Sequence, residues 1–475
     1  MKKRHTYLFM ILFILLTYIL GITTYAFSAV DYSFMRTNSD NISKEPVKPG
    51  NRILIVVPHP DDETIGMGGG IYNWLKQGKK IKVVIMTNGD GFRKAVIENL
   101  KVQNPVSSDY IKLGKMRQNE SIEALKELGL SPKDVIFLGY GDGTLSYLWW
   151  ANWESSKPRN AANGYAYSPY SNSYVKHTGY AGENVLANLT QIIKDYDPTD
   201  IFYPDPDDMH PDHWATSNFV RLAVEKSNCK ATLYSFLVHH YQWPVPLLYV
   251  PETGLYPPLS LETSGTKWHI NPLDNATVRI KHKAMLKYKS QYKVMAGFLD
   301  SFIRKNELFG TYDDRYYLVG KDIKPNFTQR GPLPYAVIQS GVNDNPLLRI
   351  EGSDDISAVG LASDGNNYYF ALQMRGNANK DTSYFLNALI LYKDGKMGRL
   401  RINIKDFKAE EIMDSKDSID VGNISAGHYK NRIWFTVPAN KIGSPTKIFL
   451  NAETYFIEKR IDKTAWRMVM PQYGP

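Results

Sequence analysis

Short apolar runs alternate with amphipathic segments of helical length between about residue 52 and residue 238. The predicted strands cover residues 53–57, 82–86, 134–138, 200–203 and 231–238, and the predicted helices lie near residues 70–77, 111–128, 185–196 and 214–226. Strands that are separated by helices predict right-handed βαβ units and a mostly parallel sheet. The pattern therefore predicts an α/β domain with a Rossmann-like three-layer core.

The pattern changes after about Gln329. Short β-prone segments, separated by turn residues, follow at 356–361, 368–373, 386–392, 433–437 and 447–450. Asp364-Gly365 and Asp394-Gly395 are typical of hairpin turns. We expect residues 51–328 to form the α/β domain and residues 329–475 to form a C-terminal, all-β, sandwich-like accessory domain.

The first 30 residues predict export from the cytoplasm. A basic stretch, Met1–His5, precedes an uncharged run from Tyr7 to Phe27, which has about the length of one bilayer crossing. Ala26–Ala29 is an acceptable cleavage site, but the run is long for a signal peptide, which favours an uncleaved anchor. We expect residues 1–30 to be a signal peptide or membrane anchor and residues 31–50 to be a polar linker. The remainder would be extracytoplasmic, either membrane-anchored or secreted.

Composition limits the chemistry of the chain. The 475 residues carry a formal net charge of +9 and a single cysteine, Cys229. One cysteine excludes an intramolecular disulfide framework and a Cys-rich zinc site, so any metal would be held by His, Asp and Glu. The sequence contains no dense Lys/Arg tract with interleaved aromatic residues, so we expect no nucleic acid binding.

The first candidate motif follows the strand at residues 53–57 and reads His59-Pro60-Asp61-Asp62-Glu63. Ligands of open α/β sheets bind at the carboxyl ends of the strands. His59 and Asp62 are three residues apart, so in a tight turn both can face one point, and imidazole with carboxylate suits zinc. Asp61 lies between them and is free to act as a base. The alternative is a turn in which the aspartates cap the following helix.

The second cluster also lies between a predicted strand and a helix, and it ends in His210-Pro211-Asp212-His213. Because parallel strands open on the same edge of a sheet, His59, Asp62 and His213 can meet around one ion. Two imidazoles, one carboxylate and a water describe an open catalytic zinc site.

Roles for the remaining side chains follow from this arrangement. Zinc lowers the pKa of bound water toward about 7, and Asp61 would take the proton from that water. His210, when protonated, would stabilise the oxyanion or protonate the leaving amine. Asp212 could hydrogen-bond a histidine ring and fix its orientation.

Together the two motifs resemble those of the PIG-L/LmbE-like zinc N-deacetylases, and the resemblance covers roughly residues 51–310. Enzymes of this family remove acetyl groups from N-acetylglucosamine units in inositol-linked sugars, bacterial thiol precursors and related glycans. The resemblance therefore implies a metal-dependent hydrolase that acts on a C–N amide bond. Weaker supporting matches are Asn88-Gly89-Asp90, Arg117-Gln118-Asn119-Glu120, Leu138-Gly139, Gly141-Asp142-Gly143, Lys283-Ala284 and Ser290-Gln291.

The resemblance also implies a role for each matching position. Arg117 and Asp142 look like the positions that hold sugar hydroxyls in such enzymes. The alternative for Arg117 is a surface ion pair with Glu120, three residues further along the helix. For the two main motifs the implied roles are zinc ligands at His59, Asp62 and His213, the general base at Asp61, and assistance at the tetrahedral intermediate by His210, oriented by Asp212.

Three features depart from the small cytosolic members of that family: the export segment, the β-rich domain and an aromatic insertion between Ser146 and Ala181. They favour a cell-surface or extracellular glycan, or a glycoconjugate, that carries N-acetylhexosamine. Aromatic residues of the insertion could stack on sugar rings or pack the insertion onto the core. The β-rich domain could be a carbohydrate-binding module, or its aromatic residues could form its own core.

Other interpretations remain open. The chain could be a surface glycan-binding protein that keeps the fold without turnover. A divalent metal other than zinc would also accept nitrogen and oxygen ligands. A nucleotide-binding site at Gly66–Gly70 is disfavoured, because that run lacks the spacing G-x-G-x-x-G.

Overall fold

The computed structural model describes residues 42–474, except residues 262–263, 342–351, 414 and 423. The predicted leader at residues 1–30 lies outside the described residues, as do residues 31–41 of the predicted linker. Within the described ranges, no helix is both long enough and apolar enough to cross a membrane. The described end of the linker contacts the fold: Ile42–Ser43 form strand β1, which pairs with β7 (Thr266–Pro272).

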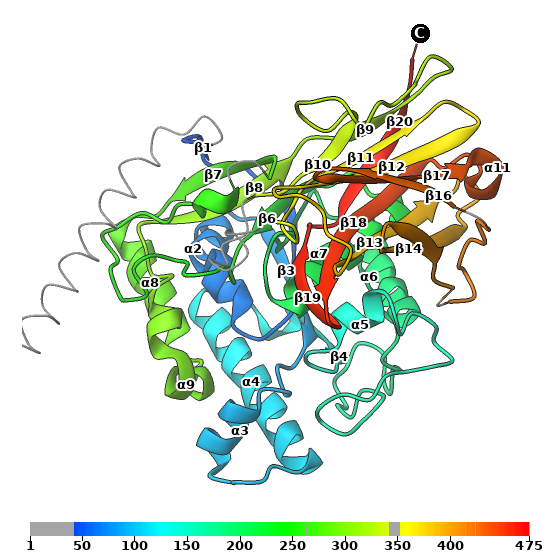
Figure 1. The fold of residues 1–475 in the computed structure, drawn as a ribbon. Helices are drawn as coiled ribbons and strands as arrows, with labels where there is room; N and C mark the ends of the chain where they lie inside the picture. The colour runs from blue at the N-terminus through cyan, green and yellow to red at the C-terminus, as the bar shows by residue number, and fades with distance from the viewer. Residues whose placement is uncertain (1–41, 262–263, 342–351, 414, 423, 475) are drawn as a thin grey trace, which may run out of the picture.

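An eight-stranded sheet forms the centre of the N-terminal unit (Figure 1), with its strands in the order β1-β7-β8-β6-β5-β2-β3-β4. The strands from β6 to β4 pair in parallel, whereas β8 is antiparallel to β6 and β7. The predicted α/β class with a mostly parallel sheet is confirmed. The other strands are β2 Arg52–Val57, β3 Lys80–Thr87, β4 Val135–Tyr140, β5 Asp200–Pro204, β6 Thr232–Phe236 and β8 Asn306–Tyr312.

Helices cover both faces of this sheet, because alternate residues of a strand point to opposite sides. Ile53, Ile55 and Val57 of β2 belong to one apolar core, which α2, α4 and α8 complete. Leu54 and Val56 belong to a second core, which α5, α6 and α7 complete. The helices are α2 Asp62–Lys76, α3 Arg93–Leu100, α4 Ser107–Glu127, α5 Leu145–Trp149, α6 Gly182–Tyr196, α7 Pro211–Ser227, α8 Asn275–Met285 and α9 Lys289–Asp300, with short 3-10 turns at Pro132–Asp134 and Leu259–Leu261.

In the described part of the C-terminal β-rich unit, twelve strands form one sheet, and most of their pairings are antiparallel. The two ends of this sheet, β15 and β16, contact each other, so the sheet is nearly closed around an apolar core. The predicted all-β class is confirmed, in the form of one nearly closed sheet. Its elements are β9 Arg315–Val319, β10 Ala336–Gln339, β11 Ile356–Ser363, β12 Asn367–Met374, β13 Ser383–Leu391, β14 Met397–Lys405, β15 Lys408–Glu411, β16 Ser425–Tyr429, β17 Arg432–Pro438, α11 Ala439–Ile442, β18 Lys447–Phe456, β19 Lys459–Lys463 and β20 Arg467–Tyr473.

The β-rich sheet includes one strand that lies upstream of the expected start at residue 329. Strand β9 pairs in parallel with β11 and β20. Only Asp313 and Asp314 separate β9 from β8 of the first sheet. The chain therefore passes from one sheet to the other within two residues, without the change in composition that marks residue 329.

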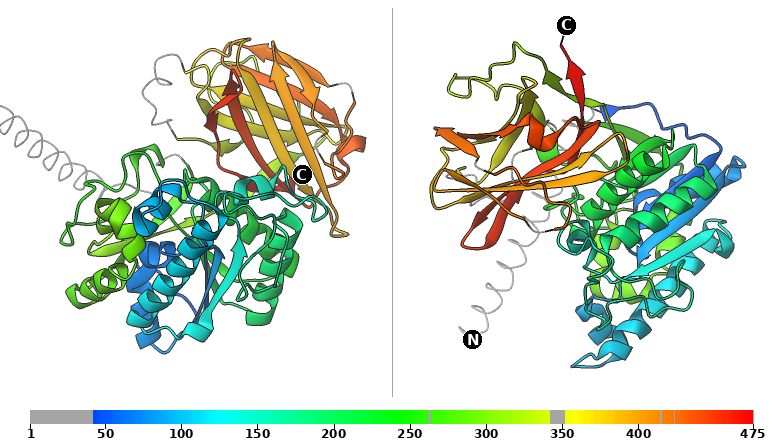
Figure 2. Two further views of the ribbon diagram at one scale, coloured as in Figure 1. Left: turned by 90° about the horizontal axis from the view of Figure 1, so that it is seen from below. Right: turned by 90° about the vertical axis from the view of Figure 1, so that its right-hand side faces the viewer.

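The two units share an apolar interface, along which the β-rich unit lies on one side of the α/β unit (Figure 2). Trp149 of α5 packs against Phe449 of β18 and against Trp466, with ring centroids 5.6 Å apart in both contacts. The guanidinium of Arg399 donates to the carbonyl of Trp150 at 3.0 Å. At Trp149, an aromatic residue of the insertion therefore packs onto the core.

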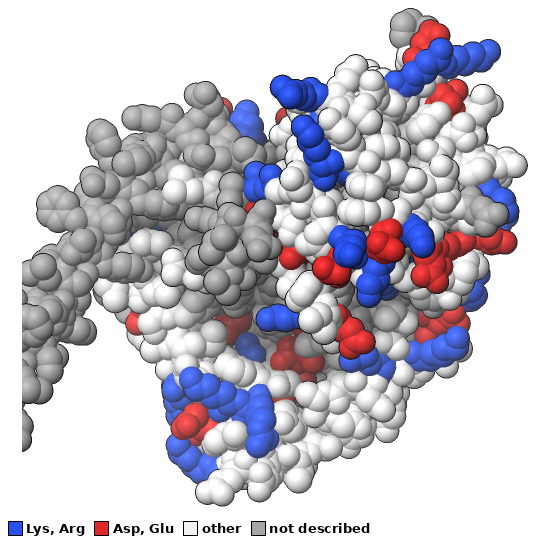
Figure 3. All heavy atoms as spheres, in the orientation of Figure 1, with Lys and Arg blue, Asp and Glu red and all other residues white. Residues whose placement is uncertain are grey.

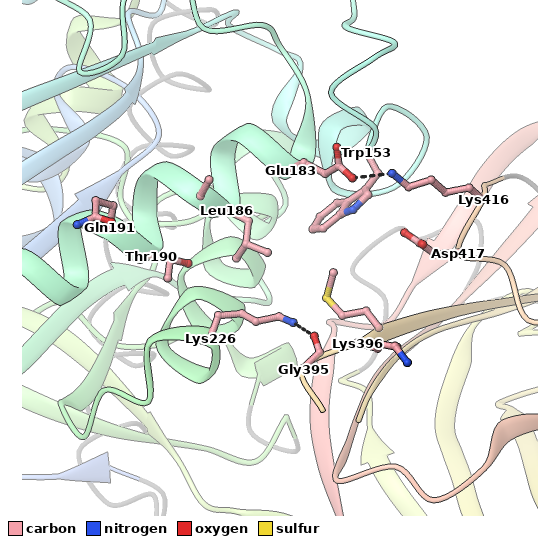
Figure 4. Close-up of a pocket in the computed structure, with 12 residues that line it drawn as sticks. Trp153, Glu183, Leu186, Thr190, Gln191, Lys226, Gly395, Lys396, Lys416 and Asp417 are labelled. Atoms are coloured by element: carbon pink, nitrogen blue, oxygen red, sulfur yellow. Dashed lines mark hydrogen bonds and ion pairs between the residues drawn. The ribbon is translucent and has the colours of Figure 1, made fainter. Parts of the chain in front are cut away.

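A cavity of about 650 Å³ lies along the interface, between α6, α7 and the turn that joins β13 to β14. Lys416 donates to Glu183 at 3.0 Å, and Lys226 donates to the carbonyl of Gly395 at 2.5 Å, so each contact links the two units (Figure 4). On the described part of the face in Figure 3, basic and acidic side chains are interspersed. The Lys416–Glu183 and Lys226–Gly395 contacts add to the apolar interface in holding the two units together.

Candidate active site

The two sequence motifs meet at one edge of the first sheet. Strands β2 and β5 are parallel neighbours, and α2 and α7 begin just beyond their carboxyl ends. Asp61 is the residue that precedes α2, and His210 is the residue that precedes α7. Because both helices start at the same edge, the turn at residues 59–62 faces the turn at residues 210–213.

Asp62 lies between two imidazole rings in the cluster predicted to hold the metal. Its Oδ2 atom is 3.2 Å from His59 Nδ1 and 3.3 Å from His213 Nε2, and all three residues are buried. Both ring nitrogens of His213 lie within ion-pair distance of a carboxylate, Nε2 of Asp62 and Nδ1 of Asp208. Buried imidazoles beside carboxylates fit a metal ion, and two imidazoles with one carboxylate fit zinc in particular.

Charge in this cluster favours a cation. Burial raises the pKa of Asp62, but the neighbouring His213 and His59 outweigh burial and hold that pKa well below its usual value. Burial lowers the pKa of His213, but the carboxylates of Asp208 and Asp62 outweigh burial and raise that pKa to about 9. The buried carboxylates thus draw positive charge to this point.

The side chain of Asp61 points away from the predicted metal ligands. Its carboxylate accepts a hydrogen bond from Arg117 Nη2 at 3.0 Å, while its backbone N–H donates to Glu63 at 3.0 Å. Burial raises the pKa of Asp61 to about 7, although the charge of Arg117 opposes this shift. Asp61 is therefore placed as a carboxyl group that can exchange a proton near neutral pH.

Arg117 of α4 does not form the surface ion pair with Glu120. It is buried, and it also donates to the carbonyls of Gly89 at 2.9 Å and Pro60 at 2.8 Å. Glu120 instead accepts hydrogen bonds from Ser290. Arg117 lines the cavity at the site, but its described contacts hold Asp61 and the two adjoining loops.

The side chain of Asp212 contacts a different ring from the one expected. It accepts hydrogen bonds from the backbone N–H groups of Gly143 and Leu145, and its Oδ2 lies 3.4 Å from His59 Nε2. The ring of His210 is held by the backbone instead, because Asp212 N–H donates to His210 Nδ1 at 3.2 Å. The carboxylate of Asp212 therefore supports His59, while its amide fixes His210.

Asp142 lies on the other side of His59. Its Oδ1 is 3.1 Å from His59 Nε2, and its Oδ2 accepts from the N–H of Gly91 at 2.8 Å. Burial raises the pKa of Asp142, but contact with His59 outweighs it and lowers that pKa strongly. Asp142 also lines the cavity, as a residue that binds sugar hydroxyls would.

Two residues of the site were not identified from the sequence. Asp208 Oδ2 is 3.1 Å from His213 Nδ1 and accepts hydrogen bonds from the N–H groups of Val238 and His239. The ring of His239 lies 4.6 Å from that of His213. His239 comes shortly after β6, at the same sheet edge. Its position after a predicted strand could therefore have identified it as a candidate site residue from the sequence.

The donor atoms allow more than one set of ligands. Among the described residues, three groups have donor atoms that lie within 4.8 Å of one another, and none of them contains all three predicted ligands. Burial and the neighbouring His213 lower the pKa of His239 to about 3, so this ring is neutral and can donate a lone pair. The three combinations are His59 with His210 and His213, Asp62 with His213 and His239, and His59 with Asp142 and Asp212.

A cavity of about 650 Å³ opens at this cluster. Its lining joins the acidic and histidine-rich edge of the sheet to the aromatic insertion and to α9. The lining residues include His59, Asp61, Asp62, Arg117, Asp142, Tyr147, Arg159, His210, His239, Gln291 and Phe298. The cavity has the size of known small-ligand sites.

Comparison with known proteins bears on the central part of the chain. Residues 54–224 match the family model described as PIG-L, GlcNAc-PI de-N-acetylase, which confirms the predicted resemblance over this range. The 1D-myo-inositol 2-acetamido-2-deoxy-alpha-D-glucopyranoside deacetylase of Mycobacterium sp. (strain KMS) is 30% identical over 204 residues, which are 42% of this chain and 53% of that protein. The chain thus spans about half the length of the curated relatives it matches.

A solved structure matches a larger share of the chain at lower identity. The N,N'-diacetylchitobiose deacetylase from Pyrococcus horikoshii covers 60% of this chain and 90% of its own, with 20% sequence identity and a TM-score of 0.35.

Proposed function

We propose that this chain, whose residues 54–224 match the PIG-L family, is a metal-dependent N-deacetylase. Its substrate would be an N-acetylhexosamine unit of a cell-surface or extracellular glycan or glycoconjugate. One observation carries the proposal: the buried carboxyl group of Asp61 and the cluster of His59, Asp62 and His213 line or adjoin one cavity of about 650 Å³. Names of the curated relatives, which describe deacetylases of an acetamido sugar, support the choice of substrate.

Zinc is the metal that the donor set favours, although other divalent ions accept the same atoms. Bound zinc would supply Lewis-acid polarisation of the amide carbonyl and of water. The protein would hold it with His59, Asp62 and His213. Asp208 would fix the ring of His213 from behind, since it lies 3.1 Å from Nδ1.

Asp61 would carry the proton during hydrolysis. As the water oxygen bonds to the acetyl carbon, the carboxylate of Asp61 takes a proton from that water. As the C–N bond breaks, the same carboxyl group can return the proton to the amine nitrogen, which leaves acetate and a free aminosugar. Arg117 positions the carboxylate through its contact at 3.0 Å.

His210 would act as a neutral hydrogen-bond donor. Its Nδ1 accepts from the backbone N–H of Asp212 at 3.2 Å, so the ring proton lies on Nε2. Burial, together with the adjacent His59 and His213, lowers the pKa of His210 to about 4. The Nε2–H group would therefore stabilise the oxyanion without a full charge of its own.

Activity and metal content can be measured on the purified chain after loading with zinc. Acetate release from N-acetylated chito-oligosaccharides is expected from the wild type. Asp61→Asn is expected to lose at least ~10²-fold in kcat, as is typical for loss of a general base, and to keep its bound zinc. The matched control is Glu123→Gln, which removes an exposed carboxylate of α4 and should leave the rate unchanged.

The same assay separates the proposal from its main alternative. Glycan binding by wild type with no acetate release from any N-acetylated sugar would favour a binding protein without turnover. Full activity in Asp61→Asn would overturn the assignment of the base. Loss of zinc in His213→Ala, with the fold retained by circular dichroism, is expected if His213 is a ligand.

We also propose that the chain acts outside the cytoplasm. The support for this proposal is the uncharged run from Tyr7 to Phe27 behind a basic N-terminus. Fusion of residues 1–50 to a phosphatase that is active only after export is expected to give phosphatase activity. A fusion that stays inactive, while a known exported control is active, would contradict the location but leave the enzymatic proposal untouched.

A further inference from the structure

The aromatic insertion forms one wall of the active-site cavity. Tyr147 and Arg159 line the cavity, and so do the next three residues, Asn160–Ala162. His59 and Asp62 line the same cavity. A ligand that fills the cavity would therefore contact both the metal cluster and the insertion.

Arg159 is held in place by backbone and ring contacts. Its backbone N–H donates to the carbonyl of Tyr180 at 2.9 Å. Its guanidinium carbon lies 3.5 Å from the centroid of the Tyr147 ring, which is a close cation–π contact. Tyr147 is itself in the short helix α5, whose neighbour Trp149 is part of the buried core. The guanidinium thus packs on a residue of a helix that is part of the folded core.

Arg159 differs from the other arginine of the cavity in its charge balance. Arg117 is neutralised by Asp61, at 3.0 Å. Among the described residues, no carboxylate lies within ion-pair distance of Arg159. The guanidinium instead donates a hydrogen bond to a neutral group, Asn152 Oδ1, at 3.4 Å. A partly buried guanidinium without an anionic partner loses part of its hydration, and an anion of a bound ligand can offset that loss.

The geometry of arginine also indicates the type of ligand. A guanidinium presents planar, paired N–H donors that match a carboxylate or a phosphate. Tyr147 is 47% exposed, so part of its side chain remains available for contact with a sugar. The pair therefore combines an anion site with an aromatic surface on one wall of the cavity.

We propose that Arg159, supported by Tyr147, forms a subsite for an anionic group that is attached next to the N-acetylated sugar. The anion is a carboxylate, as in a uronic acid, or a phosphodiester. This inference rests on the proposed deacetylase function, because it places the acetylated sugar at His59 and Asp62. The preferred substrate is then an acidic glycan rather than a neutral one.

The test compares three defined substrates in the zinc-loaded full chain. They are N-acetylchitotetraose, which is neutral, a hyaluronan tetrasaccharide, which carries a carboxylate on alternate units, and an N-acetylglucosamine 1-phosphate methyl ester, which carries a phosphodiester. Arg159→Gln is expected to raise KM at least tenfold for the anionic substrate that the wild type prefers, with kcat unchanged. The KM for the neutral substrate should stay within twofold.

Two further variants give controls, one for the position of the positive charge and one for the paired N–H donors. Lys157→Gln removes a positive charge from an exposed residue of the same insertion, outside the cavity lining, and should change no KM. Arg159→Lys keeps the charge but loses the paired donors, so its KM should fall between those of wild type and Arg159→Gln. An effect in Lys157→Gln equal to that in Arg159→Gln would indicate general attraction of anions and would overturn the subsite.

The outcomes also separate this inference from the function on which it rests. No acetate from any of the three substrates, together with no tighter binding of the two anionic ones in isothermal titration, would count against both. Equal KM values of wild type and Arg159→Gln for every substrate that is turned over would overturn the subsite alone. A rise in the KM of Arg159→Gln that is confined to the substrate with the carboxylate, or to the substrate with the phosphodiester, would support the subsite and identify its anion.

Discussion

At the residue scale, Asp61 combines an unusual backbone with an unusual side-chain environment. Its φ angle is 133° and its ψ angle is −31°, in a region that L-residues rarely adopt and that costs on the order of 1–3 kcal/mol. Its carbonyl accepts from the N–H groups of Thr64 and Ile65, so the same residue starts α2. The strained turn directs the carboxylate toward Arg117 while Asp62 faces the histidines. Two adjacent acids thus receive different environments.

Asp208 offers a test of how the metal site is supported. Asp208→Asn removes the negative charge that lies 3.1 Å from His213 Nδ1 but keeps the size of the side chain. We expect zinc affinity to fall by ~10–100-fold, because His213, the proposed ligand, loses the carboxylate that fixes its ring. Competition with a chelator measures the affinity. Asp195→Asn, an exposed acid of α6, is the control, and equal affinities in both variants would contradict the role of Asp208.

Asp90 predicts a pH dependence of stability. Burial and the nearby Asp142 raise the pKa of Asp90 to about 6, while hydrogen bonds from Tyr170 at 2.7 Å and Asn163 at 2.9 Å oppose the shift. A carboxyl group with a raised pKa stabilises the fold fully below its unfolded pKa of about 3.9, and that contribution is lost as the pH rises through about 6. A shift of this size corresponds to about 3 kcal/mol.

Asp90→Asn should therefore change the pH profile of unfolding. The variant does not titrate at this position, so the free energy of unfolding of the wild type, relative to the variant, should fall as the pH rises from 4 to 7. Urea unfolding at several pH values measures this difference. A difference that is constant across the range, or that grows with pH, would contradict the assignment.

The sequence predicted which side chains gather at the site better than it predicted their partners. His59, Asp62 and His213 are brought together because sheet edges follow from the strand pattern. The partner of Asp212 could not be predicted, since it depends on the backbone of residues 143–145, which the β4–α5 turn positions. Long-range contacts between loops carry no periodic signal.

At the element scale, the glycine-rich run of α2 serves packing rather than nucleotide binding. The helix bends at Met67, whose φ is −152°, and the N–H groups of Gly69 and Gly70 each donate at 2.8 Å to the carboxylate of Glu307 on β8. A Cβ at Gly69 would lie 2.6 Å from Leu273. Glycine is needed because the backbone of α2 approaches its neighbours directly.

Glu307 also pairs with a buried lysine of α8. Lys281 Nζ lies 2.8 Å from Glu307 and 2.9 Å from the carbonyl of Ile65, and both charged side chains are at most 1% exposed. Glu307→Gln is expected to lower the free energy of unfolding by about 3 kcal/mol, because it leaves a buried charge without its partner. Chemical denaturation measures this change.

The double variant tests the reason for that loss. Lys281→Met combined with Glu307→Gln removes both charges, so it should recover part of the stability lost in Glu307→Gln alone. Additive losses in the double variant would contradict a direct pairing. The helices α8 and α9 and strands β7 and β8 were not predicted from the sequence pattern.

At the scale of the whole molecule, the β-rich unit supports the loop that carries His210. Arg467 of β20 donates to Asp207 at 2.6 Å, and its guanidinium lies 4.7 Å from the ring centroid of Tyr312. Asp207 is three residues before His210. The composition of the chain predicted two domains, but it could not predict that the second contacts the loop before His210 in the first, since that contact joins residues 260 positions apart.

Arg467→Met tests this connection between the units. It leaves Asp207 largely buried without its cation, so we expect a loss of about 3 kcal/mol in the free energy of unfolding. The loop before His210 would lose a contact that holds it in place. We therefore expect kcat to fall about tenfold with KM nearly unchanged, because a small displacement of a reacting group slows the chemical step. Arg460→Met, which breaks a more exposed pair with Glu453 in the same unit, should change stability by less than about 1 kcal/mol and leave kcat intact. Lower stability with an unchanged kcat in Arg467→Met would mean that the β-rich unit stabilises the α/β unit without positioning the loop before His210.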